Sequence, residues 1–114
     1  MPLTFLTPDE ANEFTWPVTA TMLTPDGPVA QTFTPRFLEI DEDELNAIFK
    51  EPKSDIALLQ RVLIGWDDLL DRAGKTLPFS AAARDQLTKK PRLRKAVVEA
   101  YIDAILGGER VEGN

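Results

Sequence analysis

Three short segments of the chain carry side chains of the kind that bind phosphate, metal ions or polyanions. Gly74-Lys75-Thr76 has the ending of a phosphate-binding loop, but that motif needs a glycine at the position of Leu69. Pro78 also prevents a helix from starting at Thr76, as such a loop requires. We therefore interpret this segment as a tight turn with an exposed lysine and threonine.

Aspartates form the second segment, at Asp67, Asp68 and Asp71. Closely spaced carboxylates can bind a divalent cation or act as an acid–base pair, but aspartates after a helix are more often turn residues. The acidic run 41–44 lacks the glycine and the terminal glutamate of a calcium loop at the required offsets. We therefore predict no metal site and no cofactor.

The third segment is basic and surrounds Pro91, with Lys89, Lys90, Arg92, Arg94 and Lys95. A basic cluster can bind nucleic acid, but no aromatic residue is interleaved here to stack on bases. The formal net charge of −6 also opposes binding to a phosphate backbone. We predict no nucleic-acid partner, and leave open a protein partner or a solvated helix start.

Histidine and cysteine are both absent from the chain. Their absence removes the commonest general base, the thiolate nucleophile and the commonest metal ligands, so we predict that the protein is not an enzyme. The chain has no apolar run long enough to span a bilayer, and its first residues lack the basic start of a signal peptide. We expect a cytoplasmic protein without a membrane partner.

The first part of the chain is predicted to be an arm (1–12) followed by a β-hairpin (13–40). Apolar residues alternate with threonines on both sides of Thr24-Pro25-Asp26-Gly27-Pro28, which is typical of two strands and a turn. Pro28 lacks the amide hydrogen that an Asp26-Gly27 loop would need, which favours Pro25-Asp26 at the tip. The resulting register pairs Phe14 with Phe37, Val18 with Phe33 and Met22 with Val29.

Helical patterns occupy most of residues 41–107. We predict helices over 41–51, 54 to about 66, 80–90 and about 92–106, with a small second hairpin in the loop 67–79. Asp41, with Glu44 at the reciprocal position, and Ser80 are the expected N-caps. The predicted fold class is α+β: one domain (13–107) with an N-terminal β-hairpin packed on a small bundle of about four helices, and a mobile tail (108–114).

The last predicted helix is apolar around most of its circumference. It has more apolar surface than a fold of 114 residues can easily cover. Surplus apolar surface often marks a site of interaction. The candidate protein-binding residues are Leu93, Val97, Val98, Tyr101, Ile102 and Ile105, joined by Trp66 and Phe79. For Trp66, as for Trp16, the alternative to an exposed contact is a place in the core.

A series of residues in 62–107 has a recognisable order: Gly65-Trp66, Leu69-Leu70-Asp71, Gly74, Leu77-Pro78-Phe79-Ser80, Leu87, Pro91, Leu93-Arg94, Ala96, Ala100-Tyr101, Ala104 and Gly107. This order resembles the C-terminal half of tail assembly chaperones of long-tailed phages and prophages, and Thr32–Leu45 resembles their N-terminal half. The sequence departs from that pattern at Arg72-Ala73-Gly74-Lys75 and at Lys89-Lys90.

The resemblance implies a non-catalytic helper in the bacterial host cytoplasm. It would bind the phage tape measure protein, keep its long helices soluble and help to recruit tail tube protein. Two alternatives stay open: a structural tail component such as a terminator or connector, and a small regulatory domain that binds another protein.

Overall fold

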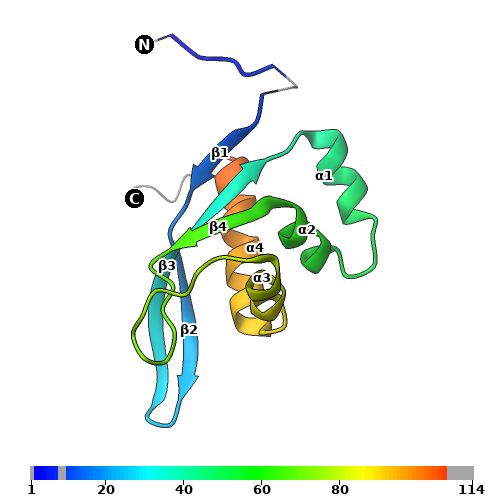
Figure 1. The fold of residues 1–114 in the computed structure, drawn as a ribbon. Coiled ribbons are helices and arrows are strands. Elements are labelled where there is room, and N and C mark those ends of the chain that lie inside the picture. The colour runs from blue at the N-terminus through cyan, green and yellow to red at the C-terminus, as the bar shows by residue number, and fades with distance from the viewer. Residues whose placement is uncertain (1, 8–9, 108–114) are drawn as a thin grey trace.

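The computed structural model describes residues 2–7 and 10–107, and it confirms the predicted α+β class (Figure 1). Four strands and four helices follow one another along the chain. Their bounds are β1 Asn12–Thr15, β2 Val18–Thr24, β3 Gly27–Glu39, α1 Glu42–Phe49, α2 Ser54–Val62, β4 Leu63–Asp67, α3 Ala81–Thr88 and α4 Pro91–Ile105. The tail predicted over 108–114 lies outside the described residues.

The N-terminal hairpin has the predicted register. β1 pairs Phe14 with Phe37, and β2 pairs Val18 with Phe33 and Met22 with Val29, all antiparallel to β3. Trp16 lies in the chain between β1 and β2, and its amide donates to the Pro35 carbonyl oxygen at 3.2 Å in the same register. β1 and β2 therefore continue one another along one side of β3, and the long ribbon turns at residues 25–26 as predicted.

The second predicted helix is shorter than expected, because α2 ends at Val62 and the next five residues form β4. β4 pairs antiparallel with the segment of β3 opposite β1, so it adds a strand on the other side of β3. Gly65 weakens a helix, whereas isoleucine and tryptophan suit a strand. A Cβ atom at Gly65 would lie 3.5 Å from the Cβ of Arg36, so the Arg36 side chain lies closely over this glycine.

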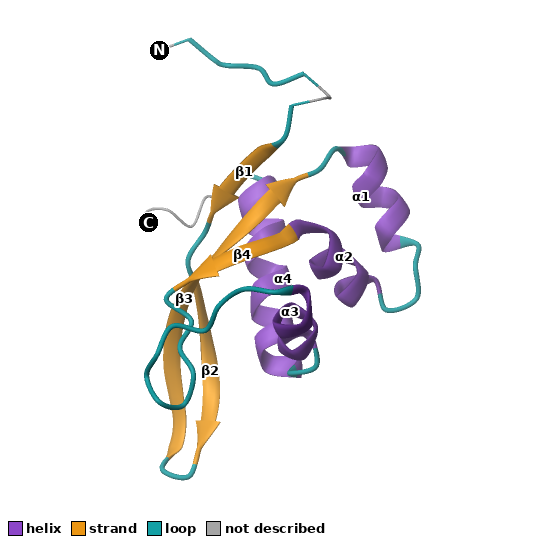
Figure 2. Cartoon of the chain, in the orientation of Figure 1, coloured by secondary structure: helices purple, strands orange, loops and turns teal. Residues whose placement is uncertain are grey.

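The core lies between one face of the sheet and the helices (Figure 2). Strands, α2, α3 and α4 all contribute fully or nearly fully buried side chains, including Val18, Phe33, Phe37, Leu58, Leu59, Val62, Leu63, Leu87, Val97 and Tyr101. The opposite face of the hairpin carries exposed threonines, and the hydroxyls of Thr19 and Thr32 are hydrogen-bonded at 2.8 Å. The sheet therefore has one apolar and one polar face, as the alternation predicts.

Both predicted helix caps are present. Asp41 Oδ1 accepts a hydrogen bond from the Glu44 amide at 2.9 Å, and Ser80 Oγ accepts one from the Ala83 amide at 3.0 Å. The Glu44 carboxylate does not complete the expected capping box, since it pairs with Arg61 and ties α1 to α2. An antiparallel bridge between residues 70 and 76 confirms the small second hairpin.

None of the helices within residues 2–7 and 10–107 is long and apolar enough to cross a lipid bilayer.

Candidate interaction surface

The helix predicted to dock a partner faces largely inward. Val97 and Tyr101 are fully buried, and Trp66, in β4, is only 8% exposed. α4 lies between the sheet and helices α2 and α3, and its wide apolar face is used by these neighbours. These three residues are therefore corrected from candidate contacts to core residues, because they offer almost no surface to another molecule in this fold.

Tyr101 joins α4 to the end of the hairpin. Its hydroxyl donates to the Leu38 carbonyl oxygen at 2.9 Å and accepts from the Ile40 amide at 3.4 Å. Its ring packs edge-on against Phe37, with centroids 5.1 Å apart, and stacks near Phe14 at 6.0 Å. Burial raises the pKa of the Tyr101 hydroxyl above its ordinary value, so the neutral donor form is favoured.

Trp66 and Phe79 hold the ends of the loop that follows β4. The indole N–H of Trp66 donates to the Leu77 carbonyl oxygen at 2.8 Å, and its ring meets Phe79 edge-on with centroids 4.7 Å apart. Phe79 stays partly exposed. This pair stabilises the loop, and the burial of Trp66 is the place in the core that the sequence left open for it.

The remaining candidates on α4 are partly buried against the core: Leu93, Val98, Ile102 and Ile105. The most exposed apolar side chain at this helix is Leu106, which caps its C-terminus and is 76% exposed. Most of the surplus apolar surface that the sequence predicts on this helix is thus covered by its own fold. Whether the half-exposed residues contact a partner stays a prediction.

Large exposed apolar side chains lie instead on the arm and on the hairpin. Leu3 and Phe5 on the arm are 89% and 80% exposed, and Leu23 near the hairpin tip is 68% exposed. The sequence reasoning did not single out these residues. For Leu23 one signal was available: residues 14–35 contain a single charged side chain, Asp26, in a chain of which 28% is charged.

An open groove of about 670 Å³ lies between the arm and the end of β3. We call it the arm groove. Its large apolar lining residues come from two separate stretches of chain and are Leu3, Phe5, Leu6, Leu38 and Ile40. Apolar surface from the arm thus faces apolar surface from the sheet across an open channel.

Four lining residues of the arm groove are acidic, and we call them the acidic rim: Glu10, Glu39, Asp41 and Glu44. Arg61 is the one cation among the lining residues, and it is paired with Glu44. Hydrogen bonds from the backbone and hydroxyl of Thr7 lower the pKa of Glu10, which keeps this carboxylate ionised. A groove lined by both apolar side chains and carboxylates suits an apolar segment flanked by lysine or arginine.

The segments with possible polar chemistry form turns and local contacts. Asp71 Oδ1 accepts hydrogen bonds from the Ala73 and Lys75 amides, and Gly74 has a φ of 82°, so the Gly-Lys-Thr segment is a turn closed by Asp71. In the part of the chain that the structure describes, no three carboxylates are grouped as they would be around a metal ion. Arg94 of the basic segment pairs with Asp55 at 2.7 Å, while Lys89, Lys90, Arg92 and Lys95 are exposed.

Comparisons with protein families, curated proteins and solved structures find no match to this chain. Several residues of the series noted in 62–107 have structural roles in this fold. Trp66 and Phe79 hold the loop, Ser80 caps α3, and Tyr101 fixes α4 to the hairpin.

Proposed function

We propose that this chain is a tail assembly chaperone of a long-tailed phage or prophage. It binds an apolar helix of the tape measure protein in the arm groove, keeps that client soluble in the bacterial host cytoplasm and helps to recruit tail tube protein. The observation that carries the proposal is the arm groove itself, where the fold leaves Leu3 and Phe5 almost wholly uncovered. The resemblance in residues 62–107 supports the choice of client.

The chemistry of the groove suits a helical client. An α-helix is about 10–12 Å wide and offers apolar side chains along one stripe, which a groove with two apolar walls can cover. Burying a side chain such as that of Leu3 or Phe5 contributes about 1.5–3 kcal/mol. A helix covered in this way loses the apolar surface through which long helical proteins aggregate.

The acidic rim adds selectivity. The carboxylates of Glu10 and Glu39 attract lysine and arginine beside the apolar stripe and disfavour an acidic helix. Because the rim is exposed to solvent, this attraction is screened by salt, whereas the apolar contact is not.

Co-expression with the tape measure protein of a long-tailed phage tests the proposal. We expect the wild-type chain to keep the client in the soluble fraction and to co-purify with it, and Phe5→Asp to reduce the recovered complex at least tenfold, since the charge would lie in the apolar groove. Leu70→Asp is the matched control, because Leu70 is also exposed, at 56%, but lies on the loop after β4.

Equal recovery with Phe5→Asp and wild type would contradict the arm groove as the binding site. Absence of any complex with the wild-type chain would contradict the proposed function. Stoichiometric presence of the chain in purified tails would instead favour a structural tail component.

A further inference from the structure

The outer edge of β2 presents unpaired backbone groups. The Trp16 amide donates to the Pro35 carbonyl oxygen, and hydrogen-bonded pairs alternate along an antiparallel ladder. The unbroken register from Val18 to Thr24 then directs the backbone groups of Thr19, Thr21 and Leu23 away from β3. Within the described residues β2 pairs with β3 alone, so these N–H and C=O groups form a free edge.

This edge lacks the features that usually prevent strands from pairing between molecules. Such edges are normally protected by lysine, proline or a bulge. β2 has the sequence VTATMLT, without charge or proline, and pairs with β3 without a register shift. The free edge of β3 in the same hairpin is different, because the same alternation places Pro28 on it.

A second copy of this chain is the partner that fits the edge. The chain has a net charge of −6, so two copies repel one another at long range. The stretch 14–35 has only Asp26, at the tip, so the strands of this hairpin add little to that repulsion when two copies approach there. A suitable partner must supply an extended, uncharged strand, and β2 is such a strand.

We propose that β2 pairs antiparallel with β2 of a second copy, so that the two sheets become one across a two-fold axis. With Thr21 opposite Thr21 of the second copy, Thr19 lies opposite Leu23 of that copy. All three outward-facing residues are then paired, giving about six backbone hydrogen bonds. In this register odd-numbered residues lie opposite odd-numbered ones and even opposite even. The apolar faces of the two copies therefore lie on the same side of the joined sheet.

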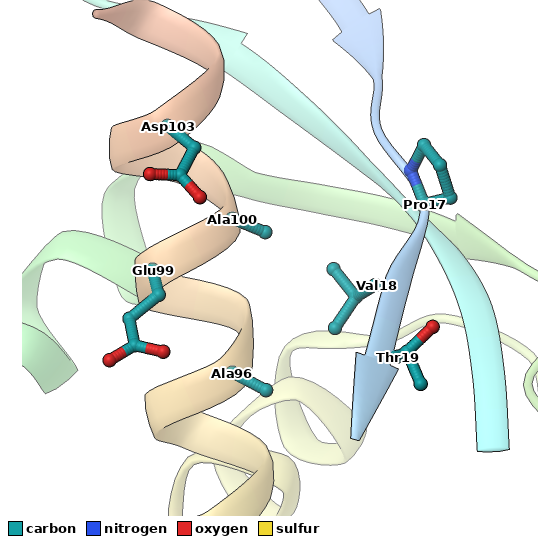
Figure 3. A pocket seen from close by; sticks show the side chains of 7 residues that line it. All are labelled: Pro17, Val18, Thr19, Ala96, Glu99, Ala100 and Asp103. Carbon is teal, nitrogen blue, oxygen red and sulfur yellow. The ribbon is translucent and has the colours of Figure 1, made fainter. Parts of the chain in front are cut away.

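A hollow lies beside β2. It has a volume of about 150 Å³ and is lined by Pro17, Val18, Thr19, Ala96, Glu99, Ala100 and Asp103. Figure 3 shows it between α4 and β2, on the side of β2 away from β3, with the small side chains of Ala96 and Ala100 facing it. An added strand would run beside this hollow, where Glu99 and Asp103 are the charged lining residues.

Sedimentation and light scattering of the purified chain without any client test the proposal. We expect a mass about twice the 12.7 kDa of the chain. Thr21→Pro removes an amide that faces the free edge. The dissociation constant of the dimer should therefore rise at least tenfold while the monomer stays folded. Ala30→Pro is the matched control: it removes an amide from the free edge of β3.

Amide exchange measured by NMR locates the interface. The amides of Thr19, Thr21 and Leu23 should become protected as concentration rises. In Thr21→Pro, which has no amide hydrogen at position 21, those of Thr19 and Leu23 should lose that protection. A wild-type chain that stays monomeric at millimolar concentration would overturn the proposal. So would a dimer that Ala30→Pro breaks and Thr21→Pro does not. No client takes part, so failure here leaves the proposed function untouched.

Discussion

At the scale of single residues, Tyr101 shows how one side chain can look like a contact residue and be a core residue. Its position on an apolar helix face is compatible with both. The hydroxyl identifies Tyr101 as a core residue, because it forms hydrogen bonds with the backbone of Leu38 and Ile40 at the end of the hairpin. A buried hydroxyl with two backbone partners stabilises the junction between sheet and helix.

Replacing Tyr101 by phenylalanine tests this role. The change removes a hydrogen bond and leaves the Leu38 carbonyl without its donor, so we expect the free energy of unfolding to fall by about 1–2 kcal/mol at neutral pH. Urea unfolding followed by circular dichroism measures the loss.

The same variant should show a specific pH dependence. The pKa of Tyr101 is raised above 10.0 in the folded protein, so the neutral form is favoured by folding. Its contribution is fully present below about pH 10 and is lost as pH rises further, because the unfolded chain ionises first. The stability difference between wild type and Tyr101→Phe should therefore shrink above pH 10; an unchanged difference would contradict the assigned environment.

At the scale of elements, α1 and α3 have equivalent caps but different anchoring. None of the eight residues of α1, all of which are described, is fully buried, and α1 is attached to α2 through partly buried side chains and the Glu44–Arg61 pair. α3 buries Leu87 and Thr88. The two helices should therefore respond differently to loss of a cap.

Asp41→Ala and Ser80→Ala each remove one capping hydrogen bond, which costs about 1 kcal/mol. For Ser80→Ala we expect that loss in the global free energy of unfolding. For Asp41→Ala we expect roughly fivefold faster amide exchange in α1 and a smaller global effect, since α1 can open by itself. Hydrogen exchange and urea unfolding compare the two; equal global losses would show that α1 unfolds only with the rest.

At the scale of the whole molecule, sheet and helices share one core. Phe37 is fully buried and lies in the same cluster as residues of α2, α3 and α4. Such sharing predicts a single cooperative unfolding transition. Far-ultraviolet circular dichroism and tryptophan fluorescence should give superimposable urea curves.

Phe37→Ala should remove about 3–5 kcal/mol, a large part of the about 5–15 kcal/mol typical of a small domain. Both signals should shift together in this variant. Two separated transitions would indicate that the hairpin and the helices unfold independently.

The sequence by itself determined the features that depend on neighbours in the chain. Alternation and the position of Pro28 predicted the hairpin register, and Asp41 and Ser80 marked helix starts, because these depend on local hydrogen bonding and side-chain period. The α+β class followed from the order of these patterns. The end of α2 did not, since Leu63–Asp67 became a strand through pairing with the distant β3.

Only the tertiary structure decided which apolar faces are covered. The periodicity of α4 shows that it has a wide apolar face, but not that the sheet, α2 and α3 occupy most of it. The same packing leaves Leu3, Phe5 and the edge of β2 uncovered, which places the candidate surfaces away from α4. Burial depends on contacts between segments that are far apart in the sequence, and a local residue pattern contains no information about those contacts.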